Sequence, residues 1–283
     1  YAENLPLQEW LNAMVFPFEA KITPEDCYWG TLLSCAEMAR YGCVSFSDMY
    51  YHMEEGARAA LDAGIKMNLS DSLLAFNGEG LDDLPVKGTL DRLIRDVQGA
   101  GDGRIVVDCN IHAEYTSNPR AVADLAAYAK EHGLRLQVHV SETRLEHEEC
   151  KQRHGLTPAA YMEAHGIFDS PTTAAHCVWL EDEDFDILKK HNVSVACCPA
   201  SNLKLASGYA NIPKMLEKGI NIALGTDGAA YNNNLNILQD IYLFGVIYKG
   251  FYHDSTLLTP AQVLHTATRA GALSQGRTDC GKL

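Results

Sequence analysis

Seven short apolar runs, rich in β-branched residues, alternate with segments of helical pattern along this chain. The runs cover residues 43–46, 65–69, 104–111, 134–140, 172–178, 193–197 and 221–224. Nearly continuous apolar strands separated by helices are typical of a parallel sheet that is buried on both faces. The pattern therefore predicts an α/β fold, either a doubly wound sheet or a closed barrel.

The position of the polar residues favours the barrel. Strand after strand is expected to end in a side chain with acid, base or ligand chemistry, namely Asp48, His112, His139, His176 and Asp227. A doubly wound sheet would concentrate such residues at one switch point, whereas a (β/α)8 TIM barrel collects them at the carboxyl ends of its strands. We expect residues 1–283 to form one catalytic barrel domain that is incomplete at both ends, because only seven strands are visible.

Helix boundary signals support this division. An N-cap residue followed by proline is expected to begin helices at Thr23-Pro24, Asn118-Pro119, Thr157-Pro158 and Thr259-Pro260. Glycine is expected to end helices just before the next strand at Gly42, Gly64, Gly133 and Gly219.

Charge and cysteine usage limit the partners. The net charge of −14 argues against nucleic acid and anionic membranes, both of which need a basic patch. No apolar run approaches the roughly 20 residues of a membrane span, and the amino terminus does not resemble a signal peptide. Nine cysteines without a C-x-x-C pair or a framework spacing suit a reducing compartment. We expect a cytoplasmic protein.

Five blocks of sequence carry a resemblance to a known family. They are Asp48-Met49-Tyr50, His139-x-x-Glu142-Thr143, AHCVWL at 175–180, CPASNLKL at 198–205 and GTDGAAYNN at 225–233. Together they resemble the amidohydrolase superfamily, most closely the branch that holds the 5-methylthioadenosine/S-adenosylhomocysteine deaminases and the s-triazine hydrolases. The resemblance runs from about Leu5 to Lys282.

This resemblance implies a metal-dependent aminohydrolase acting on an amino-substituted heteroaromatic ring, with 5′-methylthioadenosine, S-adenosylhomocysteine and adenosine as first substrates. It implies one divalent metal ion, zinc before iron, held by His139 and Asp227. Asp227 would also take the proton of the attacking water, and Glu142 would shuttle a proton to the substrate. His176 would stabilise the oxyanion, and His112, with Glu142 and His176, would bind the substrate. We expect a homo-oligomer that acts on a nucleoside or another N-heterocycle.

Each of these residues also has a purely structural interpretation. His139 could be a core histidine bonded to a backbone carbonyl, and Asp227 could stabilise the turn of Thr-Asp-Gly. Glu142 could be an acid that favours a helix amino terminus, and His112 a polar loop residue. Asn202 and Lys204 could shape the pocket, although Lys204 reads more simply as a solvated charge.

One part of the family pattern is missing from the sequence. Relatives carry a His-x-His pair at the end of the first strand, and no His-x-His occurs in this chain. We therefore expect this chain alone to hold metal weakly and to be inactive. The alternatives left open are an s-triazine-type chlorohydrolase or aminohydrolase, an inactive ligand-binding barrel and a structural remnant.

Two further expectations concern packing. The helical stripe Ile237, Ile241, Phe244 and Tyr248 is expected to face the core. The remaining histidines lie beside charged residues and are expected at the surface, at positions 52, 132, 147, 154, 165, 191, 253 and 265.

Overall fold

The strands form a single parallel series. The structure, a computed structural model, describes residues 5–282. Its strands are β1 (Ser45–Tyr50), β2 (Lys66–Asp71), β3 (Ile105–Val107), β4 (Cys109–Ile111), β5 (Leu136–Val140), β6 (Thr172–His176), β7 (Ser194–Cys197) and β8 (Ile222–Leu224). Every neighbouring pair is parallel, with the order β1-β2-β3 in one sheet and β4-β5-β6-β7-β8 in the other.

The two sheets are one wall interrupted at a single residue. Asp108 separates β3 from β4, and its N–H donates to the Leu69 carbonyl at 2.8 Å. A parallel bridge between Leu73 and Ile111 then continues the pairing of the β2 segment with β4. The strand predicted over 104–111 is thus confirmed with a break, and the wall has the strand order of a (β/α)8 barrel.

The first predicted strand lies too early. The apolar run at 43–46 pointed to a strand there, but β1 begins at Ser45 and continues to Tyr50. Gly42 adopts φ +80° in the turn that follows the preceding helix, so the chain becomes extended only later. Strand β1 is at an end of the series, and none of its residues is fully buried. Its sequence can therefore alternate polar and apolar residues, and it lacks the continuous apolar run by which the other strands were recognised.

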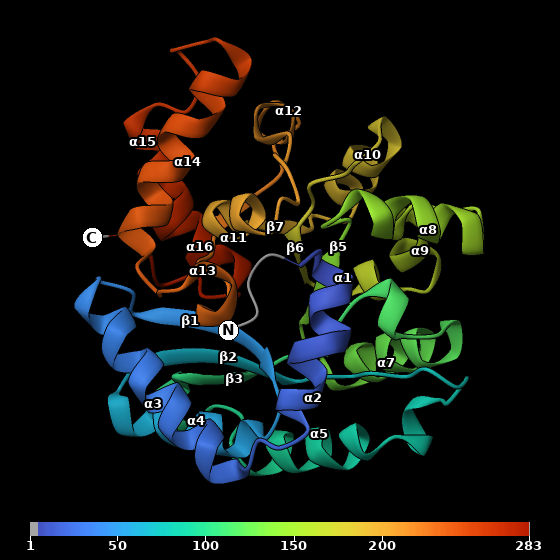
Figure 1. The fold of residues 1–283 in the computed structure, drawn as a ribbon. Coiled ribbons are helices and arrows are strands. Elements are labelled where there is room, and N and C mark those ends of the chain that lie inside the picture. The colour runs from blue at the N-terminus through green and yellow to red at the C-terminus, as the bar shows by residue number, and fades with distance from the viewer. Residues whose placement is uncertain (1–4, 283) are drawn as a thin grey trace.

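The helices lie around the outside of the strands (Figure 1). The longer ones are α3 (Pro24–Arg40), α4 (Met53–Ala63), α5 (Pro85–Asp96), α7 (Pro119–His132), α8 (Arg144–His154), α9 (Pro158–Ala164), α10 (Asp182–Lys190) and α14 (Ile237–Tyr252). Shorter turns are α1 (Leu7–Trp10), η1 (Leu11–Val15), α2 (Phe16–Glu19), η2 (Leu81–Asp83), α6 (Ala100–Gly103), η3 (Glu114–Thr116), η4 (Ile167–Asp169), α11 (Pro199–Lys204), α12 (Ile212–Glu217), α13 (Ala229–Asn232), α15 (Pro260–His265), η5 (Thr266–Ala270) and α16 (Gly271–Ser274). None of the helices within 5–282 is long and apolar enough to cross a membrane.

The predicted helix ends are confirmed. Thr23, Asn118, Thr157 and Thr259 each accept a hydrogen bond from a backbone N–H of the helix that they begin. Gly64 and Gly133 end α4 and α7 in the left-handed conformation. These local signals fix where each helix leaves the sheet, and hence how long each connecting loop can be.

The core is apolar and contains most of the cysteines. One large cluster joins β4–β8 to the helices outside them, and a smaller one joins β2 and β3 to α4 and α5. Phe244 and Tyr248 of α14 belong to the large cluster, with Ile241 packed against it. All nine cysteines are free, and seven of them are buried, as expected for thiols that pack as small apolar groups.

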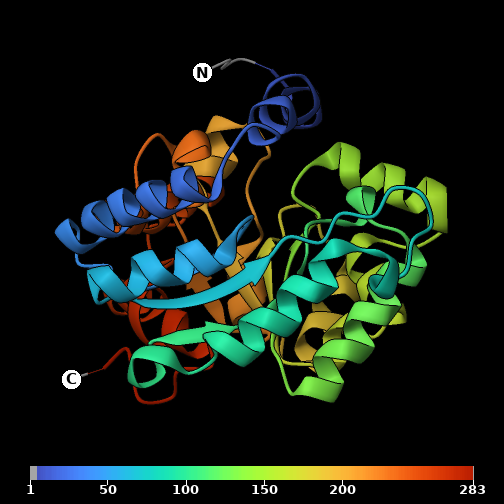
Figure 2. The ribbon, with the colours of Figure 1, turned by 90° about the horizontal axis from the view of Figure 1, so that it is seen from below.

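The two ends of the barrel wall are covered by different segments. At the carboxyl ends, Leu7, Trp10 and Leu11 pack with Tyr115, Leu205 and Tyr231 from the loops that follow β4, β7 and β8. At the amino ends, Thr173 Oγ1 and the Arg135 guanidinium donate to the carbonyl of Ser274 in α16. Figure 2 shows α1 (dark blue) and the last described residues (dark red) on opposite sides of the molecule.

Arg277 fastens the last described turn to the wall, and we predict that Arg277→Lys lowers the free energy of unfolding. The guanidinium is 7% exposed and donates to the carbonyls of Gly103, Arg104 and Met67 at 3.0, 2.8 and 3.3 Å. An ammonium cannot reach all three, so a loss of about 1–3 kcal/mol is expected in urea unfolding. Arg95→Lys, at an exposed ion pair, is the control, and an equal effect of both variants would contradict the prediction.

Candidate active site

Three strand ends turn sharply at the same edge of the wall. Ser141, His176 and Asp227 follow or end β5, β6 and β8 with φ of +49°, +68° and +60°. A non-glycine residue in this left-handed region costs on the order of 1–3 kcal/mol, and such strain is concentrated at functional sites. The turns direct polar side chains from separate strands toward one place.

Three imidazoles lie in a row at this edge. The ring centroids of His112 and His139 are 5.0 Å apart, and those of His139 and His176 are 5.4 Å apart with an interplanar angle of 19°. Burial lowers the pKa of His112 to about 3, with smaller contributions from the two other rings. Burial, and then His176, lowers the pKa of His139 as well. His112 and His139 are therefore neutral near pH 7.

The backing of His139 fixes which of its nitrogens faces the site. Nδ1 donates to the carbonyl oxygen of His112 at 2.6 Å, which leaves the lone pair of a neutral ring on Nε2. A backbone carbonyl behind Nδ1 is the usual support of an imidazole that binds a metal through Nε2. The sequence left two interpretations of His139 open, a core histidine bonded to a backbone carbonyl and a metal ligand. The Nδ1 contact with the His112 carbonyl is expected for both.

His176 is held between an amide and a carboxyl group. Its Nδ1 donates to Oδ1 of Asn202 at 2.9 Å, and its Nε2 lies 3.8 Å from Oε2 of Glu142. The side chain is 2% exposed. Asn202 therefore selects the tautomer whose lone pair faces Glu142, a role that the sequence did not indicate.

Glu142 is buried among groups that keep a proton within reach. Its carboxyl accepts from Ser207 Oγ at 3.3 Å and is 6% exposed. Burial and then the Asp227 carboxylate raise the pKa of Glu142 to about 7, opposed by His139 and by the Ser207 hydrogen bond. A carboxyl with a pKa near 7 can both donate and accept a proton at neutral pH.

Asp227 lies close enough to His139 and Glu142 for its charge to act on both. Ser201 Oγ donates to its Oδ2 at 2.6 Å, and the N–H of Gly228 donates to its Oδ1 at 2.7 Å. Its charge raises the pKa of both Glu142 and His139. The structure thus brings together His139, Glu142, His176 and Asp227, with His112 at the end of the imidazole row.

Other residues differ from the sequence expectations. Ser201 and Ser207 hold the two carboxyl groups, and only their place inside or just after the CPASNLKL block could have drawn attention to them. Lys204 is exposed and donates to the Ala230 carbonyl and to Asn233, so it lies outside the cluster. The surface prediction is wrong for His147, which is 7% exposed because its Nδ1 lies 3.2 Å from Ser141 Oγ and its Nε2 lies 3.2 Å from Glu181.

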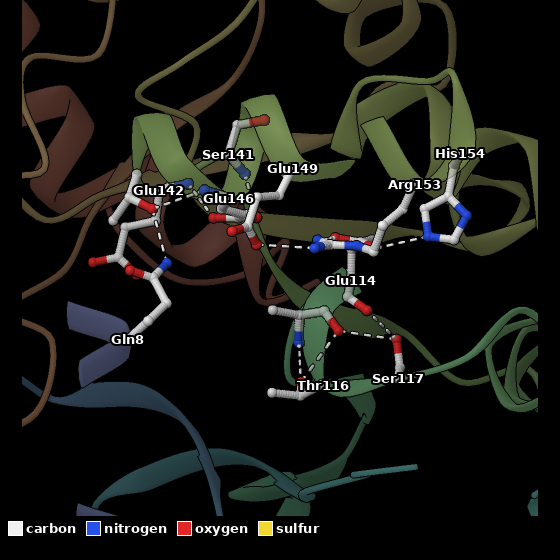
Figure 3. Close-up of polar contacts among 12 residues, drawn as sticks. Gln8, Glu114, Thr116, Ser117, Ser141, Glu142, Glu146, Glu149, Arg153 and His154 are labelled. Atoms are coloured by element: carbon white, nitrogen blue, oxygen red, sulfur yellow. Dashed lines mark hydrogen bonds and ion pairs between the residues drawn. The ribbon is translucent and has the colours of Figure 1, made fainter. Parts of the chain in front are cut away.

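Helix α8 is tied at both ends to the loops of the site (Figure 3). Near its amino end, Gln8 Nε2 of α1 donates to Thr143 Oγ1 at 2.9 Å. At its carboxyl end, Arg153 donates twice to the Glu114 carboxylate at 3.0 and 2.6 Å, and His154 Nε2 lies 2.8 Å from it. Because Glu114 is two residues after His112, these ion pairs link the loops that follow β4 and β5.

His139 and Asp227 have the chemistry of metal ligands. Neutral imidazole nitrogen and carboxylate oxygen suit zinc or ferrous iron. Catalytic zinc sites normally use three protein ligands and keep a position for water. Across residues 5–282, no group of three or more His, Cys, Asp or Glu side chains is arranged to hold a metal ion. The described residues therefore fit two ligand positions of such a site.

Comparison with curated proteins gives close relatives. The chain is 42% identical over 272 residues to the 5-methylthioadenosine/S-adenosylhomocysteine deaminase of Caldanaerobacter subterraneus subsp. tengcongensis. The aligned region covers 96% of this chain and 63% of the relative. It is 38% identical over 275 residues to the 5'-deoxyadenosine deaminase of Methanothermobacter thermautotrophicus, with 97% and 64% covered. The chain thus spans less than two thirds of the length of these relatives.

Solved structures agree with the fold. An adenosine deaminase from Xanthomonas campestris with bound zinc superposes with a TM-score of 0.92 and 29% identity, over 99% of this chain and 64% of that one. The atrazine chlorohydrolase of Arthrobacter aurescens complexed with zinc gives a TM-score of 0.89 at 23% identity, over 99% and 67%, and this likeness concerns the fold alone. The sequence profile of the amidohydrolase family matches residues 1–283. The chain therefore belongs to the amidohydrolase family, and its parallel strands and outer helices are part of the (β/α)8 barrel fold.

Proposed function

We propose that this chain carries the proton-transfer half of a hydrolytic deaminase active site that acts on the amino group of a heteroaromatic ring. The observation that carries the proposal is the buried Glu142–His176 contact of 3.8 Å beside Asp227 and His139. Replacing an amino group on such a ring by oxygen needs a proton for a ring nitrogen, a proton for the leaving amine and a stabilised oxyanion. The names of the curated relatives support adenosine-type nucleosides as the first substrates to assay, above all 5′-methylthioadenosine, S-adenosylhomocysteine and adenosine.

Each side chain has a role that follows from its surroundings. Glu142, with its pKa near 7, protonates the ring nitrogen as water adds to the neighbouring carbon. His176 is fixed by Asn202 with Nε2 3.8 Å from the Glu142 carboxyl group, from which Nε2 receives a proton; the protonated ring then stabilises charge that develops on oxygen. Asp227 accepts the proton that the attacking water releases and returns it to the amino group, so that ammonia leaves. His112 Nδ1 contacts Thr116 Oγ1 at 2.9 Å, which orients the ring to contact the substrate.

A divalent metal ion, zinc before iron, completes the proposal. His139 Nε2 and an Asp227 oxygen would hold it, together with ligands beyond the two that residues 5–282 supply. When bound, such an ion acidifies water so that hydroxide is available near neutral pH. No lysine stands at the end of β4. Members of the amidohydrolase superfamily with two metal ions usually bridge them through a carboxylated lysine at this strand end, so its absence here supports a mononuclear site.

The remaining expectations concern the cell and the assembly. Nine free cysteines support a reducing compartment such as the cytoplasm. A row of exposed apolar side chains on α14, Leu238, Tyr242 and Val246, is 56%, 68% and 41% exposed, and it supports association into a homo-oligomer.

We predict that Glu142→Gln, made in the full-length protein, keeps the metal and loses turnover. The amide matches the carboxyl group in size but cannot shuttle protons, so kcat should fall on the order of 10²-fold or more. Ammonia release from 5′-methylthioadenosine is the assay, and elemental analysis gives the metal content. Glu183→Gln, at an exposed acid of α10, is the control. Full activity of Glu142→Gln would show that another residue moves the proton and would contradict the prediction.

We also predict that His139→Ala and Asp227→Ala each lower the amount of zinc retained by the protein. Each variant removes one donor from an already small set, whereas His265→Ala removes an exposed imidazole of α15 and should have no effect. Zinc titration followed by calorimetry measures the affinities without any need for activity. If both variants bind zinc as the wild type does, the ligand assignment is wrong.

A further inference from the structure

The turn that carries Glu142 depends on one other side chain. Ser141 has φ +49°, a conformation that a serine adopts only when its surroundings fix it. Its N–H donates to Oε1 of Glu146 at 2.9 Å, and the N–H of Glu142 donates to Oε2 of the same carboxyl group at 2.7 Å. Figure 3 shows Glu146 beneath the turn, with dashed lines to both residues. One carboxyl group therefore binds two successive backbone N–H groups.

The position of Glu146 is set by the start of α8. Thr143 is the N-cap, and its Oγ1 accepts from the N–H of Glu146 at 3.1 Å. This places Glu146 in the first turn of the helix, with its side chain directed back over the residues that precede the cap. His147, the next residue, contacts Ser141 Oγ. The helix start therefore supports the turn through both of these side chains.

Burying the Glu146 carboxyl group to bind two N–H groups costs free energy. Glu146 is 2% exposed, and burial, followed by the nearby Glu142 carboxyl, raises its pKa to about 8, opposed by three backbone hydrogen bonds. A buried carboxyl next to another buried carboxyl costs free energy that a serine or a solvent-exposed acid would avoid. The gain is geometric, because two hydrogen bonds from neighbouring peptides leave the turn little freedom.

We propose that Glu146 is a positioning residue for the deamination reaction, which clamps the Ser141–Glu142 backbone so that the Glu142 carboxyl group lies against His176. The proposal rests on the proposed function of Glu142. It assigns Glu146 no contact with substrate or metal, and its effect passes through Glu142 alone.

The experiment compares Glu146→Gln with the wild type in the full-length, metal-loaded protein. Both oxygens of the Glu146 carboxyl group can accept an N–H hydrogen bond in either protonation state, because a hydroxyl oxygen keeps its lone pairs. An amide nitrogen cannot accept, so in Glu146→Gln the NH₂ group must face one of the two N–H donors and the turn must shift. Displacement of a catalytic group by about 1 Å can cost on the order of 10²-fold. We expect kcat for 5′-methylthioadenosine to fall about 10- to 100-fold, with KM changed less than about 3-fold and the zinc content unchanged.

Two companion variants separate positioning from stability. Glu148→Gln changes an exposed acid on the same helix, which pairs with Arg144, and should keep full kcat. Glu146→Asp retains two acceptor oxygens on a shorter stem and should recover part of the lost kcat. Unchanged kcat in Glu146→Gln, a change in KM alone, or Glu146→Asp no better than Glu146→Gln would overturn the proposal.

A readout that needs no turnover distinguishes this proposal from the proposed function. Hydrogen exchange followed by mass spectrometry should show faster deuterium uptake at residues 141–142 in Glu146→Gln, with β5 and the rest of α8 still protected. Uniform loss of protection over β5 and α8 would make Glu146 a structural residue and contradict the proposal. If the wild type released no ammonia from any nucleoside, the proposed function would be wrong, and Glu146 would have no role in catalysis. The hydrogen-exchange result would still show whether Glu146 holds the Ser141–Glu142 backbone in place.

Discussion

The parallel register of β5 and β6 is the constraint on which the rest of the site depends. Val140 pairs with His176, and His139 pairs with Ala175, so the two histidines leave adjacent strands one step apart at the same edge. Because paired residues share a face of the sheet, regular strands would direct these two histidines to opposite faces. The left-handed backbone of His176, with φ +68°, turns its ring back to stack on that of His139. A slip of one residue would turn either imidazole to the opposite face of its strand. The small residues Ala174 and Ala175 that precede His176 leave room for the row of rings.

Burial then decides the protonation of the groups that the register brings together. Removal from water lowers the pKa of His112 and His139 and raises that of Glu142. Near pH 7 this gives two neutral rings and a Glu142 that exchanges its proton readily. The hydroxyl of Ser207 opposes this shift, because it donates a hydrogen bond to the Glu142 carboxyl group. A glutamate at the surface, with its ordinary pKa of about 4, would be ionised and would not be suited to donate a proton near neutral pH.

The sequence predicted the parts of this molecule that depend on local pattern. The alternation of apolar runs and capped helices located the strands, and the polar residues at their ends located His139, His176 and Asp227. It did not predict contacts that depend on a loop folding back, such as Asn202 on His176 or Ser207 on Glu142, because their spacing along the chain carries no periodic signal. His147 was placed at the surface because charged residues surround it in the sequence, but its ring faces Ser141 and the preceding Glu146 is buried as well.

The amino ends of the strands carry contacts that stabilise the barrel wall, and the carboxyl ends carry the residues of the candidate active site. At the amino ends, Arg135 and Thr173 both bind the Ser274 carbonyl, and Arg277 fastens the turn after it. These contacts hold the wall together at the end opposite to the Glu142–His176 pair. At the carboxyl ends, α1 and η1 cover loops that contain Tyr115, Leu205 and Tyr231. The side chain of Trp10 packs edge-on against Tyr231 with ring centroids 5.1 Å apart. Chemistry at the carboxyl ends of the strands requires the loops there to stay fixed in position. In this chain, the clamp of Glu146 on the Ser141–Glu142 turn is the most direct means of fixing them.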